Sequence, residues 1–378
     1  MSFVLPTTDL AAASLRAEPL ERLCQLIEQH IAEQRYPGAQ IAIARHGKLA
    51  FAREFGLARI GTNMAMRADT PCRLYSNTKV IVAAAIWLLV EDGLLSFNDR
   101  VAEHIPEFAR NGKGAITVLQ VLTHQAGFPN APVMPPESWE DHQLLKRLVC
   151  DYTLEWTPGS RLHYHSYSAH WVLALIIEAL TKMDFRAFIR RRLIEPLGLG
   201  EEMYVGLMEE KDQARAAEMY DPGPNGKGSK LIEAENTVAF RRAGVPSGGG
   251  FASARAMAAF YQMLLGGGAL NGKRVLSPRM IQYVTRNFTG ERADDGMGGI
   301  AMHLGLGPHI RGVSEVIRGL GSLAHPNVFG HGGVGSSYCW ADPESGVSYA
   351  YISNTKIPDP WHSRRLELIA NCAHAAIL

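Results

Sequence analysis

The amino-acid sequence predicts an α+β fold of the α/β-sandwich type, in which helices flank an antiparallel sheet and a helical domain stands beside it. Two strand-like segments near the start of the chain, joined by a short turn, predict an antiparallel hairpin. Glycine-rich, strand-like runs return after about residue 290. Helical periodicity dominates the residues between these regions. A cleft between two such parts is a usual place for a functional site.

The first third of the chain is typical of one helix followed by one hairpin. Residues 20–34 carry apolar side chains at helical spacing, and Pro37-Gly38 ends that pattern. Residues 39–45 and 49–55 have the composition of strands, and His46-Gly47-Lys48 joins them. We therefore expect an antiparallel sheet edge to form from this part of the chain.

Helical patterns fill the middle of the chain, and strands return near its end. Residues 80–90 are apolar throughout and are followed by Glu91-Asp92-Gly93, which is typical of a buried helix with a glycine C-cap. We assign residues 1–80 and 290–378 to an α/β domain with the antiparallel sheet, and residues 81–289 to a mainly helical domain, with approximate boundaries. Further helices are expected at 118–122, 142–148, 171–180, 185–193, 255–265 and 363–376, and strands within 331–340 and 346–352.

The composition is that of a globular protein and gives no reason to expect a polyanionic partner. The chain has 378 residues, 47% of them hydrophobic, and a formal net charge of +1, so its charge favours neither nucleic acid nor an acidic membrane. Its five cysteines include no Cys-x-x-Cys pair, so neither a zinc ribbon nor a disulfide framework is expected. The longest apolar run is too short to span a bilayer, and residues 1–15 lack the pattern of a secretory signal. We expect a cytoplasmic protein, and the oligomeric state stays open.

The tetrapeptide Ser-Asn-Thr-Lys occurs twice, at residues 76–79 and at residues 353–356, and its surroundings distinguish the two copies. The first copy opens the apolar helix, which places Lys79 one turn after Ser76 on the same face. The second copy leads into Ile357-Pro358-Asp359-Pro360, whose prolines prevent a helix from forming there. Only Ser76 and Lys79 are therefore expected to lie side by side.

A serine and a lysine that lie side by side suit acyl transfer. A serine hydroxyl becomes a strong nucleophile when a neighbouring base takes its proton, and a lysine is such a base when burial or nearby cations lower its pKa. The start of a helix also supplies backbone N–H groups where an oxyanion would form. Ser76 and Lys79 are thus candidates for nucleophile and base.

A tyrosine followed two residues later by Asn or Ser is the next element to expect, because a phenol beside a lysine can relay the serine proton to a leaving group. Tyr75 adjoins Ser76 and points away from it, and Tyr351 lies inside a predicted strand. Tyr164-His165-Ser166 remains, between a Pro-Gly corner and the next predicted helix. A polar turn in that position can present Tyr164 to a cleft.

Residues 329–335, Phe-Gly-His-Gly-Gly-Val-Gly, suit a strand that lines the cleft, because glycines let a substrate approach the backbone closely. Such a strand can donate a backbone N–H to an oxyanion. The segment also matches Gly-x-Gly-x-x-Gly, but residues 336–343 are typical of strand and turn, not of a helix that could hold a pyrophosphate. We therefore expect no dinucleotide cofactor.

The three segments Ser76-Asn77-Thr78-Lys79, Tyr164-His165-Ser166 and His331-Gly332-Gly333 resemble, in order and rough spacing, the motifs of the serine β-lactamase and penicillin-binding protein superfamily. Within that superfamily the chain is most similar to the family VIII carboxylesterases, which are related to class C β-lactamases. The likeness covers residues 20–355. It implies a β-lactamase-like fold with the active site in the cleft between the two domains.

The resemblance also implies a role for each matching residue. Ser76 would carry the acyl group, and Lys79 and Tyr164 would share the general acid and base work. The backbone N–H groups of Ser76 and Val334 would form the oxyanion hole. The residues implied in substrate binding are Ser166, His331, Gly332 and Gly333, and the reaction would need neither a metal nor another cofactor.

Two residues depart from the β-lactamase pattern. His331 stands where a lysine is usual, and Ser166 stands where an asparagine is usual. Because histidine has an ordinary pKa of about 6.5, it is mostly neutral at pH 7 and holds a substrate carboxylate poorly. Ser166 has a shorter reach than asparagine and offers no amide. Both changes favour the hydrolysis of a neutral, short-chain acyl ester over that of an anionic lactam.

Other functions also fit parts of the sequence. A β-lactamase, a D-amino-acid peptidase or an acyltransferase would use the same acylation. A noncatalytic binding or assembly protein could keep the fold, although the intact motifs argue against it. The chain lacks the Gly-x-Ser-x-Gly of an α/β-hydrolase. His163, His165 and His170 lack the spacing and the carboxylate partner of a metal site.

Overall fold

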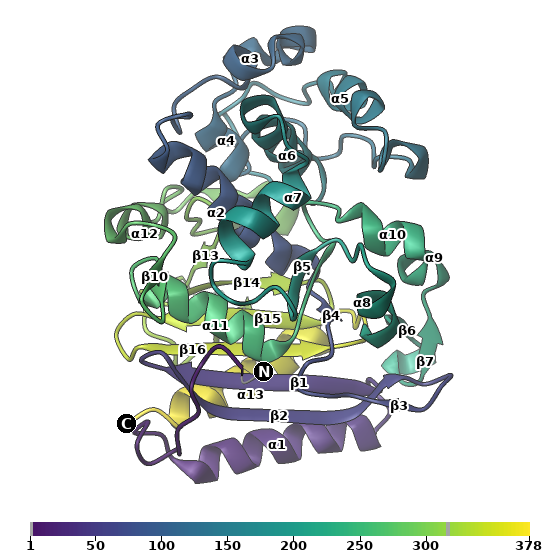
Figure 1. The fold of residues 1–378 in the computed structure, drawn as a ribbon, viewed down its shortest axis with the longest axis vertical. Coiled ribbons are helices and arrows are strands. Elements are labelled where there is room, and N and C mark those ends of the chain that lie inside the picture. Colours follow the sequence, from purple (N-terminus) through teal and green to yellow (C-terminus); the bar gives the residue numbers. More distant parts are fainter. Residues whose placement is uncertain (1–2, 315–317) are drawn as a thin grey trace.

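The computed structural model describes residues 3–314 and 318–378, and within them a seven-stranded sheet forms the base of the molecule (Figure 1). Its strand order is β13-β14-β15-β16-β1-β2-β3, and neighbouring strands are antiparallel. The bounds of these strands are β1 (Gly38–Arg45), β2 (Lys48–Arg59), β3 (Met64–Ala65), β13 (His309–Ile310), β14 (Phe329–Gly333), β15 (Ser337–Asp342) and β16 (Val347–Ser353). The predicted antiparallel sheet is confirmed.

Helices and short strands make up most of the remaining structure. The α-helices are α1 (Ala17–Ala32), α2 (Thr78–Glu91), α3 (Val101–His104), α4 (Val118–Leu122), α5 (His142–Cys150), α6 (Ser168–Thr181), α7 (Phe185–Ile189), α8 (Glu210–Arg215), α9 (Glu233–Asn236), α10 (Val238–Ala243), α11 (Ala254–Leu265), α12 (Pro278–Val284) and α13 (Trp361–Ala375). The short strands are β4 (Cys72–Arg73), β5 (Met203–Val205), β6 (Tyr220–Pro222), β7 (Ser229–Leu231), β8 (Gly250–Ala252), β9 (Ala269–Leu270), β10 (Lys273–Arg274), β11 (Ala293–Asp294) and β12 (Ile300–Ala301). The 3-10 turns are η1 (Tyr75–Asn77), η2 (Pro106–Ala115), η3 (Pro136–Ser138), η5 (Pro224–Gly226), η6 (Asp295–Met297) and η7 (Arg318–Leu320), and η4 (Arg190–Ile194) is a π-helical turn.

The two ends of the chain meet in the middle of the sheet. Strand β1 pairs with β2 on one side and with β16 on the other, so that Ile41 stands opposite Tyr351. The run predicted as strand within 331–340 is a hairpin of β14 and β15 instead. Its turn, residues 334–336, forms because Gly335 takes a positive φ of 64° and Ser336 N–H donates to the Gly333 carbonyl at 3.1 Å.

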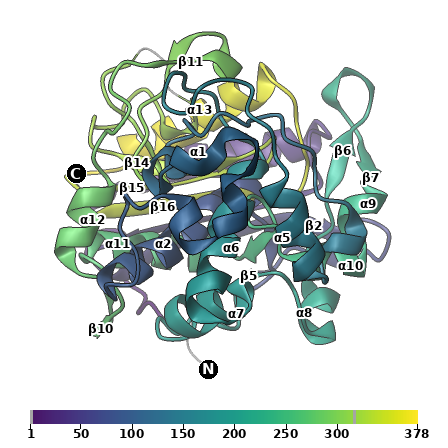
Figure 2. The ribbon, with the colours of Figure 1, turned by 90° about the horizontal axis from the view of Figure 1, so that it is seen from above.

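The two faces of the sheet are covered by different helices. Ile41 and Ile43 pack in the core shared with α1 and α13, whereas Ala42 and Ala44 pack in the core shared with α2 and α11. This alternation is the period of two that a strand imposes. Figure 2 shows the molecule from above, with α5 and α6 in front of the strands.

Helix α2 is the central helix of the larger core. Every residue from Thr78 to Leu89 is buried, which confirms the buried helix predicted from the apolar run. It packs against α6, and the Trp87 indole N–H donates to the Leu306 carbonyl at 2.9 Å. None of the helices in the described part of the chain combines the length and the apolarity needed to cross a membrane.

The proposed division of the chain into two domains stays a prediction. One domain would comprise residues 1–80 and 290–378, and the other residues 81–289. Most helices of the second range lie above the sheet (Figure 1). Helix α11 also falls in that range, and it packs directly against β1, β15 and β16.

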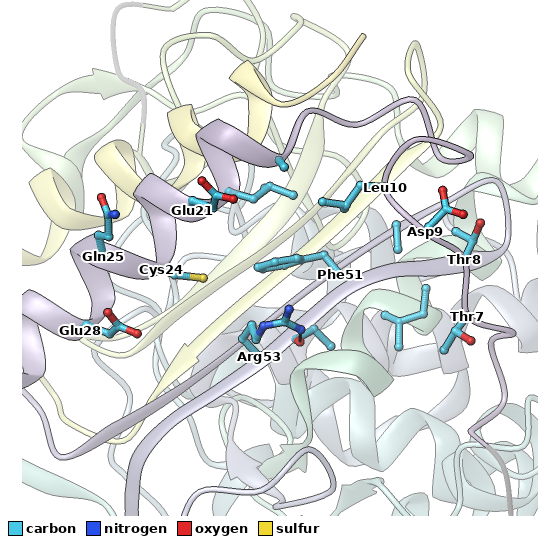
Figure 3. Close-up of a pocket in the computed structure, with 15 residues that line it drawn as sticks. Thr7, Thr8, Asp9, Leu10, Glu21, Cys24, Gln25, Glu28, Phe51 and Arg53 are labelled. Carbon is cyan, nitrogen blue, oxygen red and sulfur yellow. Dashed lines mark hydrogen bonds between the residues drawn. The ribbon is translucent and has the colours of Figure 1, made fainter.

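A hollow of about 700 Å³ lies on the α1 side of the sheet, between α1, β2 and residues 7–10 (Figure 3). Its lining includes Leu10, Cys24, Phe51 and Arg53, and the Arg53 guanidinium lies 5.1 Å from the centroid of the Phe51 ring. None of its lining residues belongs to the cleft that contains Ser76.

The second copy of the tetrapeptide ties the end of β16 to the first hairpin. The Ser353 hydroxyl donates to the Ser336 carbonyl at 2.8 Å. The Asn354 amide oxygen accepts from Gly38 N–H at 3.0 Å, and its nitrogen donates to the carbonyls of Leu57 and Ala58 at 3.1 and 3.2 Å. Residues 353–360 form no helix, as the two prolines predict, and α13 begins only at Trp361.

We expect Asn354→Ala to lower the free energy of unfolding by about 2 kcal/mol, because the Gly38 N–H and the Leu57 carbonyl lose the amide that pairs with them, whereas the Ala58 carbonyl keeps its bond from the Glu218 N–H at 3.0 Å. Chemical denaturation of the variant and the wild type measures this loss. Asn98→Ala removes an exposed amide and serves as the control. Equal stabilities of the two variants would contradict the assignment of Asn354 as a structural anchor.

Candidate active site

Ser76 lies in the 3-10 turn η1, directly before α2. Lys79 lies one turn further along, and its Nζ is 3.0 Å from Ser76 Oγ. This is the side-by-side placement that the spacing predicts. The N–H groups in the first turn of a helix have no acceptor within the helix, so the backbone N–H of Ser76 is available to a ligand.

The Lys79 amine is completely buried and has no counter-charge among its hydrogen-bond partners. Besides Ser76 Oγ, its Nζ contacts the carbonyl oxygens of Ser166 at 2.9 Å and of Ser247 at 3.0 Å. Burial lowers the pKa of Lys79 to about 7. A neutral amine can donate to the two carbonyls and keep its lone pair for the Ser76 hydroxyl, so this geometry allows Lys79 to take the serine proton.

Tyr164 lies close to Lys79 and lines the same cleft as Ser76. Nζ is 5.0 Å from the centroid of the Tyr164 ring, which is partly buried. The Tyr164 backbone N–H is shared between the two carboxylate oxygens of Asp294, at 3.1 and 3.3 Å. Asp294 is fully buried, and these hydrogen bonds hold the backbone of the turn that contains Tyr164 in place.

Two buried histidines, His124 and His165, also hold the turn that contains Tyr164 in place. His124 Nδ1 accepts from His165 N–H at 3.1 Å, and the His124 ring lies 4.6 Å from the Tyr164 ring, centroid to centroid. His165 Nδ1 donates to the His163 carbonyl at 2.6 Å, and its Nε2 accepts from Phe128 N–H at 3.1 Å. Burial lowers the pKa of His165 to about 3, so its ring is neutral and serves as a structural bridge.

Strand β14 contacts the nucleophile turn closely. A Cβ on Gly333 would lie 2.4 Å from the Leu74 carbonyl oxygen, so only glycine fits at this position. The buried Asn77 side chain reaches across to the Ser337 hydroxyl at 2.9 Å and ties η1 to β15. Val334 follows β14 in the hairpin turn, beyond the last ladder pair, and its backbone N–H can face the same space as that of Ser76.

A second histidine, His309, lies against His331 of the third motif. The His331 ring is buried and packs against the His309 ring with a centroid distance of 4.0 Å and a tilt of 31°. Its Nδ1 donates to the Gly332 carbonyl at 2.8 Å, and His309 Nδ1 lies 3.2 Å from the Tyr338 hydroxyl. No local sequence signal points to His309, because its contact with His331 depends on the pairing of β13 with β14.

A cleft of about 990 Å³ opens onto these groups. Lys79 lies behind Ser76, and the other predicted site residues line the cleft. These lining residues are Ser76, Tyr164, Ser166, His331, Gly332, Gly333 and Val334. The structure therefore brings all three motif segments to one place. Sequence reasoning missed Arg73, Ser247 and Glu235 in the same lining.

An ion cluster stands beside the nucleophile. Arg73 Nη1 lies 2.5 Å from Glu235 Oε2, and Lys356 Nζ lies 3.1 Å from Glu235 Oε1. The Tyr75 hydroxyl donates to the same carboxylate, and the Arg73 guanidinium lies between the rings of Tyr75 and Phe240 at 4.1 and 4.4 Å. Tyr75 has a positive φ of 46°, which is unfavourable for a non-glycine residue, so the cluster holds a strained residue next to Ser76.

Within the described residues, one group of three side chains lies close enough together to hold a metal ion, and this group lies outside the cleft. Its members are His142, Glu178 and Asp184, whose ligand atoms lie within 4.8 Å of one another. His142 Nδ1 is 2.7 Å from Glu178, and Arg186 lies 2.6 Å from Asp184. The guanidinium already supplies the positive charge that a cation would bring. His163, His165 and His170 do not form such a group.

Comparison with known proteins shows which proteins this chain is similar to. A family model described as Beta-lactamase matches residues 23–373. The esterase/beta-lactamase LipL of Mycobacterium tuberculosis is 28% identical over 314 residues, which cover 76% of this chain and 70% of that protein. A penicillin-binding protein homologue from Caulobacter crescentus has a TM-score of 0.81 at 26% identity, over 96% of this chain and 99% of that one. A family VIII carboxylesterase has a TM-score of 0.80 at 26% identity, over 95% and 98%.

We expect Glu235→Gln to lower the free energy of unfolding by about 2 kcal/mol, because the nearly buried Arg73 loses the carboxylate that balances its charge. Urea denaturation measures the change. Glu233→Gln alters an exposed carboxylate on the same helix, α9, and is the matched control. If both variants lose the same free energy of unfolding, the ion cluster around Glu235 does not stabilise this part of the cleft.

Proposed function

Because the chain belongs to the Beta-lactamase family and is a serine hydrolase of that superfamily, we propose that it is a carboxylesterase that hydrolyses short-chain acyl esters through an acyl-enzyme on Ser76. One observation carries the proposal. The Lys79 amine is fully buried, has a pKa of about 7, and lies 3.0 Å from Ser76 Oγ. A base with such a pKa is half deprotonated at neutral pH, as serine activation requires.

Acylation begins when Ser76 Oγ attacks the ester carbonyl carbon while Lys79 accepts the hydroxyl proton. The carbonyl oxygen becomes an oxyanion and is stabilised by the backbone N–H groups of Ser76 and Val334. The C–O bond to the alcohol then breaks. Lys79 returns its proton to the departing alkoxide, directly or through the Tyr164 hydroxyl, so the alcohol leaves neutral.

Deacylation repeats these steps with water. A water molecule takes the place of the alcohol and attacks the acyl carbon while Lys79 accepts one of its protons, directly or through the Tyr164 hydroxyl. The bond between the acyl carbon and Ser76 Oγ breaks, and the proton returns to Ser76. The products are a carboxylic acid and the regenerated enzyme.

The residues around the third motif favour a neutral ester. The paired imidazoles of His331 and His309 occupy a place where a β-lactamase-like site would hold a lysine ammonium. A fixed cation there would pair with the carboxylate of a lactam or a peptide. Ser166 is exposed in the cleft and offers a hydroxyl in place of an amide. These features support an ester over a β-lactam or a D-amino-acid peptide.

A fluorophosphonate should label Ser76 alone, and Ser76→Ala should lower kcat on p-nitrophenyl butyrate by at least about a thousandfold, because the nucleophile is lost. Intact mass, adduct mapping and steady-state kinetics measure both effects. Ser96→Ala removes an exposed hydroxyl that does not line the cleft, so it is the control and should retain activity. An adduct on another residue would refute the mechanism, and nitrocefin turnover as fast as that of short esters would refute the substrate class.

Activity should fall about tenfold per pH unit below pH 7 and level off above it, because Lys79 accepts a proton only in its neutral form. Its pKa, lowered to about 7 by burial, sets this midpoint. The measurement is kcat/KM for p-nitrophenyl butyrate from about pH 5.5 to pH 9. Lys79→Arg should be inactive throughout, because a guanidinium keeps its proton. A flat profile would exclude Lys79 as the base.

A further inference from the structure

We propose that Glu235 is a positioning residue for the reaction and that its carboxylate holds Ser76 and Lys79 in place relative to each other. This inference rests on the proposed function, in which Ser76 is the nucleophile and Lys79 is the base. Glu235 acts through Tyr75 and Arg73, and we call the two series of contacts the tyrosine link and the arginine link.

Glu235 is the anion at the centre of the ion cluster beside Ser76. Its side chain is 16% exposed, and it pairs with Arg73, which is 5% exposed, and with Lys356. Burial alone would raise the pKa of Glu235, but these two cations and the Tyr75 hydroxyl hold that pKa below its ordinary value. The carboxylate is therefore ionised at neutral pH.

The backbone that carries Glu235 is itself fixed. The neighbouring Asn236 amide donates to the carbonyls of Met219 and Ile232 at 2.9 and 2.8 Å, and its oxygen accepts from Met219 N–H at 3.0 Å. The Glu235 N–H donates to the Ile232 carbonyl at 3.2 Å. The carboxylate is thus attached to a backbone that can hold other groups in place.

The tyrosine link runs from Glu235 through Tyr75 to the nucleophile. The Tyr75 hydroxyl donates to the Glu235 carboxylate, and Ser76 is the next residue in the chain. The positive φ of Tyr75, 46°, is unfavourable for a residue with a side chain and persists only where its surroundings hold it. A change in this angle would turn the backbone that leads into Ser76, so the bond to Glu235 helps to set the position of Ser76 Oγ.

The arginine link runs from Glu235 through Arg73 to the loop that contacts the base. Arg73 Nε donates to the Gly248 carbonyl at 3.2 Å. The carbonyl of the preceding residue, Ser247, accepts from Lys79 Nζ at 3.0 Å. Without its carboxylate partner, the Arg73 guanidinium would be free to shift, and the loop that bonds to Lys79 would lose a fixed contact.

The two links meet at the reacting pair. A Cβ on Gly248 would lie 3.6 Å from Tyr75 Cα, so the loop packs against the nucleophile turn. Ser76 Oγ and Lys79 Nζ are 3.0 Å apart, and proton transfer requires that short distance. Because a displacement of about 1 Å can lower a rate about a hundredfold, the loss of Glu235 should act on kcat more than on KM.

The test measures rate per active site, so that unfolded protein does not enter the result. Intact mass after saturation with a fluorophosphonate counts the reactive Ser76 side chains, and kcat on p-nitrophenyl butyrate is divided by that count. Glu235→Ala should lower kcat per site at least about tenfold and leave KM within about twofold. Tyr75→Phe breaks only the tyrosine link and should lower kcat per site at least about threefold. This variant removes a single oxygen, so it tests the inference even if Glu235→Ala does not fold.

Two matched controls separate positioning from stability. Glu233→Ala removes an exposed carboxylate from the same helix, α9. Tyr204→Phe removes a buried hydroxyl that also donates to a carboxylate, that of Asp212, at 2.9 Å and outside the cleft. Both controls should keep the wild-type kcat per site. The double variant of Tyr75→Phe and Glu235→Ala should be no slower than Glu235→Ala alone, because the hydroxyl acts through the carboxylate.

The outcomes distinguish this inference from the function on which it rests. Fewer labelled sites with an unchanged kcat per site, an equal fall in Tyr204→Phe, or effects that multiply in the double variant would overturn the positioning role and leave the esterase proposal intact. A wild-type enzyme that neither cleaves the ester nor takes the label at Ser76 would overturn both.

Discussion

The active site depends on the burial of one amine without a counter-charge. Lys79 lies on a helix whose residues are apolar on every side, and its polar neighbours are one hydroxyl and two carbonyl oxygens. A carboxylate at this position would hold the proton on the amine and prevent it from acting as a base. The eleven-residue apolar run is therefore part of the chemistry, because it keeps both water and charge away from Nζ.

A second constraint is the close approach of strand β14 to the nucleophile turn. Gly333 lies against Leu74 with no room for a side chain, and the Asn77 side chain joins the turn to β15. These contacts set the position of Val334 relative to Ser76, and so the distance between the two backbone N–H groups proposed to hold the oxyanion. Residues that line the rest of the cleft can therefore change substrate specificity without altering this contact between β14 and the nucleophile turn.

Sequence reasoning succeeded where the relevant forces are local. The apolar run predicted α2, helical spacing placed Lys79 beside Ser76, and residues 118–122 form the predicted helix. It was less successful where distant segments meet. The run 331–340 is bent into a hairpin by Gly335, and neither the contact of His309 with His331 nor the pairing of Arg73 with Glu235 leaves a pattern in nearby residues. Such contacts follow from sheet register and from the packing of loops, which a single sequence does not reveal.

The placement of β1 between β2 and β16 has a consequence for how the protein is made. A nascent chain that has completed the first hairpin and α2 still lacks the strand on the other side of β1, which is synthesised last. Until β16 arrives, β1 presents an unpaired edge and the helix that carries Ser76 and Lys79 has no sheet of full width beneath it. Many of the contacts that complete the site thus span most of the chain, and such long-range contacts slow folding. Until β16 pairs with β1, the open edge can pair with another chain, so this is the interval in which aggregation competes with folding.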